Sequence, residues 1–270
     1  MTRFVVVPQW QGSPAARAML LVDGAEAIAG DLPRAATTRV EVPAEAGEAL
    51  DTGIRRFSAL ARVADALTAT LQTDTEPALV VGGDCGVAVP AIAHAARAHP
   101  ELAIVWFDAH GDLHTPETSP SGAFGGMALR AAGDSTPVPG SGAVPLDRAV
   151  LVGARDLDVA EAAYLASSGV QSIDVDAVAD PAALVEAVRA TGADAVYIHV
   201  DLDVLDPAVL TAVGLPTPFG LTLEQLTAAI AAVRGELPLV GSSIAGFVPP
   251  TPAAAADDLG TILRVIGALA

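Results

Sequence analysis

Residues 106–115 read WFDAHGDLHT and directly follow the apolar run LAIV at 102–105. Asp108, His110 and Asp112 occupy alternate positions where a buried strand is expected to end. Alternate side chains of an extended segment point to one face, so these three groups are expected to converge. Carboxylates beside an imidazole suit metal binding or acid–base chemistry. The spacing therefore predicts a chemical site at this strand end.

Two further acidic segments also follow apolar runs, namely GGDCG at 82–86 and HVDLDVLDP at 199–207. In the second segment we expect Asp201 and Asp203 to share a strand face. Aspartates gathered at buried strand ends would repel one another strongly, and divalent cations would remove that repulsion. Oxygen-rich ligation with one imidazole suits Mn²⁺ better than Zn²⁺. Two such ions, bridged by carboxylates at about 3.5–4 Å, could activate a water for hydrolysis.

Single residues in these segments also have structural explanations. An isolated aspartate after a strand is most often a turn or cap residue, which is the role expected for Asp84 and Asp206. Cys85 by itself is more often a small buried filler than a metal ligand. The combination of DAHGD with DLD, both after buried strands, is what favours a site over a set of turns.

The periodicity predicts strands alternating with amphipathic helices. Strands are expected at 4–8, 78–82, 102–107, 148–153, 171–175, 195–200 and 239–244. Helices are expected at 53–72, 87–98, 158–169, 181–190, 222–234 and 257–269, with Thr222 and Glu224 in the first turn of the fifth. Because the strands are almost wholly apolar, they indicate a mostly parallel sheet covered on both faces. A (β/α)8 barrel is the alternative on pattern alone.

The Gly-, Pro- and Ser-rich segments 116–126, 134–145 and 206–220 are predicted loops. No linker divides the chain, so residues 1–270 are expected to form one α/β domain. Ligands of open parallel sheets bind beyond the carboxyl ends of the strands, where these loops would lie.

Composition narrows the classes of function. Hydrophobic residues make up 52% of the 270 residues, and the single cysteine excludes an internal disulfide framework. The net charge of −18 argues against nucleic acid as a partner, whereas cations, as metal ions or as a guanidinium substrate, would be attracted. The sequence has neither a membrane-spanning run nor a signal peptide, so we expect a cytoplasmic protein without a membrane partner.

The order and spacing of four motifs resemble the arginase, or ureohydrolase, family. The motifs are GGD at 82–84, DAHGDLHTPETSPSG at 108–122, GARDLD at 153–158 and HVDLDVLDP at 199–207. The resemblance implies a three-layer, doubly wound, mostly parallel sandwich and not a barrel. It also implies hydrolysis of guanidino or formimino C–N bonds by a hydroxide that bridges two Mn²⁺ ions. The segments TSPSG and RDLD look more like arginase than agmatinase.

The resemblance assigns roles position by position. Asp108 and Asp201 resemble bridging carboxylates, His110 and Asp203 ligands of one ion, and Asp112 a ligand of the other that is also the nearest proton acceptor. Ser121, Asp158 and, more loosely, Glu161 would hold the amino-acid end of a substrate.

Three positions depart from the family pattern. Cys85 replaces a histidine ligand, and a thiolate there would shift the metal preference toward Zn²⁺ or Fe²⁺. Gly125 stands where the family usually has a proton-shuttling histidine, and Gly246 where it has a glutamate that binds the guanidinium. His114, beyond the ligand segment, is the candidate to replace the missing imidazole.

These observations favour a binuclear-metal hydrolase of linear amidines or guanidines. One alternative is a catalytically impaired member of the fold that is kept for binding or assembly, which the changes at Gly125 and Gly246 would explain. Another is a substrate choice like that of formiminoglutamase or agmatinase. By resemblance alone, a homo-oligomer, trimer or hexamer, is expected.

Overall fold

The apolar segments form strands of one sheet in the computed structural model, which describes residues 2–270. The strands are β1 (Arg3–Val7), β2 (Thr37–Arg39), β3 (Ala78–Gly82), β4 (Leu102–Phe107), β5 (Ala149–Val152), β6 (Gln171–Ile173), β7 (Ala195–Asp201) and β8 (Leu239–Ala245). They form an eight-stranded sheet in the order β2-β1-β3-β8-β7-β4-β5-β6, and neighbouring strands are parallel. The sheet is open at β2 and β6, so the barrel alternative is wrong.

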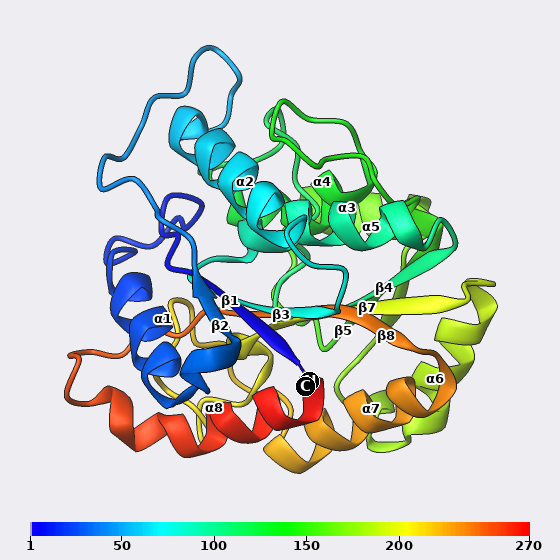
Figure 1. Ribbon diagram of the computed structural model, residues 1–270. Helices are drawn as coiled ribbons and strands as arrows, with labels where there is room; N and C mark the ends of the chain where they lie inside the picture. Colours follow the sequence, from blue (N-terminus) through cyan, green and yellow to red (C-terminus); the bar gives the residue numbers. More distant parts are fainter. Residues whose placement is uncertain (1) are drawn as a thin grey trace.

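Helices cover both faces of this sheet. They are α1 (Leu20–Asp31), α2 (Phe57–Leu71), α3 (Ala88–Ala98), α4 (Ala128–Gly133), α5 (Val159–Ser167), α6 (Pro181–Ala190), α7 (Leu223–Glu236) and α8 (Ala255–Leu269). The helices α2, α3, α4 and α5 form one layer, and α1, α6, α7 and α8 form the other (Figure 1). This arrangement confirms the predicted three-layer, doubly wound sandwich.

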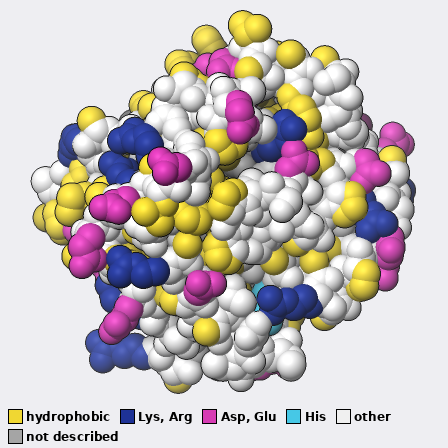
Figure 2. Space-filling view, turned by 90° about the horizontal axis from the view of Figure 1, so that it is seen from above, with side chains coloured by type: hydrophobic (Ala, Val, Ile, Leu, Met, Phe, Trp, Pro, Cys, Tyr) yellow, Lys and Arg dark blue, Asp and Glu magenta, His cyan; other side chains and the backbone are white. Residues whose placement is uncertain are grey.

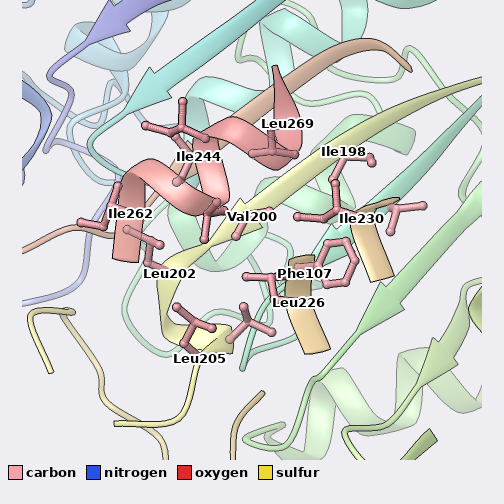
Figure 3. Packing of buried hydrophobic residues seen from close by; sticks show 14 of the residues in the cluster. Phe107, Ile198, Val200, Leu202, Leu205, Leu226, Ile230, Ile244, Ile262 and Leu269 are labelled. Carbon is pink, nitrogen blue, oxygen red and sulfur yellow. The ribbon is translucent and has the colours of Figure 1, made fainter. Parts of the chain in front are cut away.

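The two faces of the sheet carry separate hydrophobic cores. In β1, Phe4 and Val6 join one core and Val5 and Val7 the other, as the alternation of strand side chains requires. Figure 3 shows the core beneath β7 and β8, where side chains of the strands meet those of α7 and α8. Full burial of one such aliphatic side chain stabilises the fold by about 1.5–3 kcal/mol.

Most predicted elements are confirmed to within a few residues. The helix expected at 53–72 starts only at Phe57, because Arg56 has the left-handed φ of 59°. Thr222 caps α7 in a capping box, whose third residue is Gln225. The predicted loops 134–145 and 206–220 lack helices and strands, whereas the end of 116–126 enters the short 3-10 helix Gly125–Met127.

The sequence pattern missed α1, α4 and β2. Helix α1 has no side-chain cap and contains two glycines, and α4 has only six residues. The edge strand β2 reads TTR and is largely exposed, so it lacks the apolar signature of the inner strands. These elements form through their packing on the sheet and not through a strong local signal.

The four central strands are β3, β8, β7 and β4, and they are neighbours in the sheet. Each motif singled out in the sequence lies at or just beyond the carboxyl end of one of these strands, except the segment 153–158, which follows β5. The sheet order therefore places residues that are far apart in the sequence at one edge.

Candidate metal centre

The segment after β4 forms a turn and does not continue as a strand. The backbone amide of His110 donates to Asp108 Oδ1 at 2.8 Å, and Asp112 has the left-handed φ of 52°. The side chains of Asp108, His110 and Asp112 do line one cavity, as predicted, but strand alternation is the wrong reason for it. They converge because the chain folds back on itself, and not because of strand alternation.

The segment after β7 is organised in the same way. Asp201 is the last residue of β7, and Leu202–Val204 form a 3-10 helix. The amide of Asp203 donates to Asp201 Oδ1 at 2.9 Å, and the amide of Ala109 donates to Asp203 Oδ1 at 3.1 Å. The expectation that Asp201 and Asp203 share a strand face is therefore wrong, although the turn keeps both carboxylates buried at the site.

His110 connects the two segments. Its Nδ1 lies 3.3 Å from Asp108 Oδ1 and 3.1 Å from Asp203 Oδ2. Burial opposes the charged imidazole, but the hydrogen bonds to Asp108 and Asp203 outweigh it and raise the pKa of His110 to about 12. The ring nitrogen between two carboxylates shows that this point of the site attracts positive charge.

Cys85 lies at the start of the 3-10 helix Cys85–Val87, after β3. It is buried, and its Sγ donates to Asp201 Oδ2 at 2.9 Å. Burial and the nearby Asp201 carboxylate raise the pKa of the thiol well above its ordinary value. The contact with Asp201 places the sulfur in the carboxylate cluster, so Cys85 is more than a remote core filler.

Four aspartates share this buried region, namely Asp108, Asp112, Asp201 and Asp203. Burial raises the pKa of each, and in Asp201, where Asp203 adds to the effect, it reaches about 7. Asp112 Oδ2 is buried and has no hydrogen-bond partner among the described residues. Buried carboxylate oxygens without donors are what a divalent cation would satisfy, so the residues present fit a metal centre.

One group that could hold an ion consists of Asp108, His110 and Asp203, and a second consists of Cys85, Asp108 and His199. In each group the ligand atoms lie within 4.8 Å of one another. Asp108 thus belongs to both groups, as expected for a carboxylate shared between two ions.

The cluster lines a cavity of about 180 Å³. Of the predicted site residues, the lining contains Cys85, Asp108, His110, Asp112, His114, Glu161, Asp201 and Asp203. Gly125 and Gly246, the two glycines that depart from the family pattern, also line it. The structure therefore brings most of the predicted residues together around one space.

A second cluster lies in the wall of the cavity. His114 is buried, with Nε2 at 3.2 Å from Asp158 Oδ2 and 3.9 Å from Glu161 Oε2. Asp158 and Glu161 form the capping box of α5, and Glu161 Oε1 also accepts from the amide of Leu113 at 3.2 Å. These carboxylates thus fix the helix start and the imidazole together.

Ser121 and Asp158 are not among the residues that line the cavity. Ser121 Oγ accepts from the amide of Ala123 at 3.2 Å and lies 3.4 Å from Ser119 Oγ, within its own loop. A substrate contact through either side chain stays a prediction.

The two glycines differ in how strictly the backbone requires them. Gly246 has a φ of +91°, and a Cβ there would lie 2.3 Å from Asp201 Oδ1. At Gly125 the φ is ordinary, and a Cβ would lie 3.1 Å from the carbonyl oxygen of Gly12. The positive φ at 246 and the carboxylate of Asp201 therefore both disfavour a side chain at this position, including the glutamate of the family pattern.

Asp84 has the structural role that was predicted for it. Its carboxylate accepts from Gln9 Nε2 at 2.9 Å, the Gly12 amide at 2.9 Å and the Gly86 amide at 3.0 Å. Asp206 likewise accepts from the amide of Ala208 in its own turn and from the amide of Gly220 farther along the loop. Asp84 thereby connects the loop after β1 to the turn that carries Cys85.

Sequence reasoning missed His199, which lies in β7 two residues before Asp201. Its position in a strand that ends in two predicted ligands was the available signal. The ring is fully buried, and burial lowers its pKa to about 3. His199 is therefore a neutral imidazole beside the cluster.

Comparison with known proteins supports the family resemblance found in the sequence motifs. The model of the arginase family matches residues 26–260. The N(omega)-hydroxy-L-arginine amidinohydrolase of Streptomyces lavendulae is 34% identical over 206 residues, which are 76% of this chain and 72% of the relative. An arginase of Bacillus caldovelox is 31% identical over 211 residues, or 73% of this chain and 68% of the relative.

Solved structures share the fold over nearly the whole chain. The arginase of Entamoeba histolytica, in complex with L-ornithine, superposes with a TM-score of 0.85 at 22% identity, covering 99% of this chain and 97% of that one. The arginase of Bacillus caldovelox gives 0.79 at 25% identity, covering 100% and 98%. The formimidoylglutamase of Bacillus subtilis has the same fold, with a TM-score of 0.74 at 17% identity over 99% and 86% of the two chains.

The chain is an α/β protein with a doubly wound sheet and a candidate metal centre, a buried cluster of aspartates, at the carboxyl edge of that sheet. The match to the family model then assigns it to a family. This chain belongs to the arginase family and is a hydrolase of the C–N bonds of linear amidines. The resemblance seen in the four sequence motifs is thus confirmed.

Two further observations concern the helices and the surface of the protein. No helix among residues 2–270 combines the length and the apolar character needed to span a lipid bilayer. On the face covered by the α2–α5 layer, acidic and basic side chains are interspersed, without one continuous basic patch (Figure 2). The absence of a nucleic-acid partner stays a prediction from the charge of the chain.

Proposed function

We propose that the chain hydrolyses a small guanidino or formimino compound with the help of two divalent metal ions. The observation that carries this proposal is the buried cluster that lines the cavity, with Asp112 Oδ2 lacking a partner among the described residues. One ion would be held by His110 and Asp203 and the other by Asp112 and Cys85, with Asp108 and Asp201 shared.

Mn²⁺ is the proposed metal because carboxylate oxygens dominate the donor set. Cys85 adds one soft sulfur donor, which would allow Zn²⁺ or Fe²⁺ in its place. When bound, the ions would supply an activated water and the positive charge that stabilises the transition state.

The residues around the cavity would handle protons and charge. Asp112 Oδ2 has no donor beside it among the described residues and would accept the proton released when water attacks the amidine carbon. His114 Nε2 would donate a proton to the departing nitrogen, since Asp158 and Glu161 hold the ring in place at the cavity wall. The negative cluster would attract a cationic substrate.

The far end of the substrate is proposed to be an α-amino acid. Asp158 and Glu161 would face its ammonium group, and Ser121 its carboxylate. The name of the Streptomyces lavendulae relative, an amidinohydrolase of N(omega)-hydroxy-L-arginine, supports a substrate of this kind. Agmatine, which lacks the carboxylate, is proposed to be a poor substrate. A substrate like that of the formimidoylglutamase is the second candidate, because it also has an amino-acid end.

A substrate panel tests this proposal. Metal-loaded protein would be incubated with L-arginine, N(omega)-hydroxy-L-arginine, agmatine and N-formimino-L-glutamate, and the released amine-bearing product would be quantified. We expect hydrolysis of at least one amino-acid substrate and little or none of agmatine. No hydrolysis of any compound by fully metal-loaded protein would contradict the proposal.

The role of His114 is tested by His114→Gln. Loss of a positioned acid–base group lowers turnover by about 10²- to 10⁴-fold, while bound metal per chain should not change. His94→Gln, on α3 beside Arg3 and Arg97, is a control that should retain full activity. Wild-type turnover in the His114 variant would remove this residue from the mechanism.

We further propose that residues 1–270 form one domain and that the protein assembles as a homo-oligomer, trimer or hexamer, as its family resemblance implies. A single sheet whose strands come from residues 3 to 245 supports the first part. Light scattering coupled to gel filtration would measure the second, and a monomer would contradict it.

A further inference from the structure

His199 is held rigidly in the centre of the sheet. It is opposite Trp106 of β4 and Ser243 of β8 in the strand register. Its ring lies 3.8 Å from that of Trp106, centroid to centroid, and its Nδ1 lies 2.7 Å from Ser243 Oγ. These contacts fix the orientation of the imidazole and occupy one of its two nitrogens.

The other nitrogen is free. His199 Nε2 is buried and has no hydrogen-bond partner among the described residues. Leaving a buried nitrogen unsatisfied costs about 1–3 kcal/mol, so such a group is expected to have a ligand or a function. A purely structural histidine on Trp106 would not need this second nitrogen.

The imidazole of His199 lies near the sulfur of Cys85. A ring nitrogen of His199, Cys85 Sγ and a carboxylate oxygen of Asp108 all lie within 4.8 Å of one another, and all three residues are buried. Because Ser243 holds Nδ1, Nε2 is the nitrogen available to this group. The indole nitrogen of Trp106 donates to Asp108 Oδ2 at 3.1 Å and so restrains this carboxylate.

We propose that His199 Nε2 and Cys85 Sγ bind the same metal ion beside Asp108. This inference rests on the proposed metal centre and makes its two halves chemically different. The half around His110 and Asp203 offers mostly oxygen, whereas the half around Cys85 adds one sulfur and one nitrogen to the oxygens of Asp108, Asp112 and Asp201. Nitrogen and sulfur donors together favour Zn²⁺ or Fe²⁺ over Mn²⁺.

Metal binding by Cys85 and His199 would also explain why polar side chains are buried together here. The thiol would bind as a thiolate and release its proton on metal binding, which frees Asp201 Oδ2 from the hydrogen bond it accepts from Cys85. The Ser243 contact would then fix the imidazole that binds the ion, as partners of ligating histidines commonly do.

The test uses the full-length chain stripped of metal and titrated with Co²⁺, whose absorption reports its ligands. A bound thiolate gives an intense charge-transfer band in the near ultraviolet, and tetrahedral sites give strong visible bands. We expect both bands in the wild type, loss of the ultraviolet band in Cys85→Ser, and weakened visible bands in His199→Gln. His94→Gln is the matched control, since His94 Nδ1 is also buried without a partner.

Competition between metals gives a second readout. We expect the preference for Zn²⁺ over Mn²⁺ at one site to fall by about 10- to 100-fold in both Cys85→Ser and His199→Gln. Circular dichroism and the melting temperature of each metal-free variant would show that it folds.

A measurement on the wild type alone guards against variants that do not fold. X-ray absorption of the Zn²⁺ protein should show a sulfur at about 2.3 Å and imidazole nitrogen at about 2.0–2.1 Å. A shell of oxygen and nitrogen without sulfur, with two ions bound, would overturn this inference and leave the metal centre intact. No bound ion of any kind would overturn the proposed function itself.

Discussion

Gly246 provides a sharp test of how the backbone shapes the site. It follows β8, has a φ of +91°, and its amide donates to the carbonyl oxygen of Gly83 at 2.9 Å. A Cβ added here would lie 2.3 Å from Asp201 Oδ1 and 2.9 Å from Asp201 Cγ. We therefore expect Gly246→Ala to strain the backbone and to displace Asp201.

The two effects can be estimated separately. A left-handed conformation costs a residue with a Cβ about 1–2 kcal/mol. Forcing an extra carbon into a closely packed site costs about 1–3 kcal/mol more. The combined loss of about 2–5 kcal/mol in the free energy of unfolding corresponds to a fall in melting temperature on the order of 10 °C. Gly246→Glu should cost at least as much, although it introduces the carboxylate of the family pattern.

Thermal unfolding of the metal-free and metal-loaded proteins measures this prediction. Gly126→Ala is the matched control in the same cavity, because its Cβ would meet only His114 Cδ2, at 3.8 Å. That control should change the free energy of unfolding by less than about 1 kcal/mol. If Gly246→Ala melts like the wild type and binds metal as tightly, the steric reasoning about Asp201 is refuted.

Two further predictions concern buried carboxylates. Burial raises the pKa of Asp201 to about 7 from 3.8, so the folded metal-free protein keeps a proton that the unfolded chain releases. The free energy of unfolding of the metal-free protein should therefore fall as the pH rises from about 4 to 7, by about 4 kcal/mol from Asp201 alone. Added Mn²⁺ should reverse this fall. Chemical denaturation at several pH values measures it, and a free energy of unfolding that does not change with pH would contradict the prediction. Asp84→Ala removes the acceptor for Gln9 and for the amides of Gly12 and Gly86, and should lower the free energy of unfolding in urea by about 2–4 kcal/mol. An unchanged urea midpoint would show that these three hydrogen bonds do not stabilise the loop after β1.

The sequence predicted the inner sheet well because its strands are almost wholly apolar. The run LAIVWF became β4 without a shift, since a strand buried on both faces has a strong compositional signal. The edge strand β2 and the short helix α4 have no such signal, and the order of the strands is a property of long-range packing that periodicity does not encode.

The candidate site was predictable where several candidate ligands share one motif. DAHGD and DLD identified Asp108, His110, Asp112, Asp201 and Asp203, although turns and not strand alternation bring them together. The requirement for glycine at 246 depends on a left-handed φ and on the position of Asp201, and the amino-acid sequence alone reveals neither.

His199 shows a different limit. It lies in an apolar strand, where a buried histidine that packs on a neighbouring ring is the usual expectation. Its free nitrogen becomes visible only when Ser243 and Cys85, which are distant in sequence, are placed beside it. Sequence motifs thus show which residues can bind metal, and the sheet order shows which of them meet.

The most direct test of the account is the number of metal ions bound per chain. The protein would be dialysed against Mn²⁺, and separately against Zn²⁺ and Fe²⁺, then passed through gel filtration and measured by elemental analysis. The account predicts two tightly held ions per chain with at least one of these metals. Fewer than two ions with every metal would contradict a binuclear centre in this hydrolase.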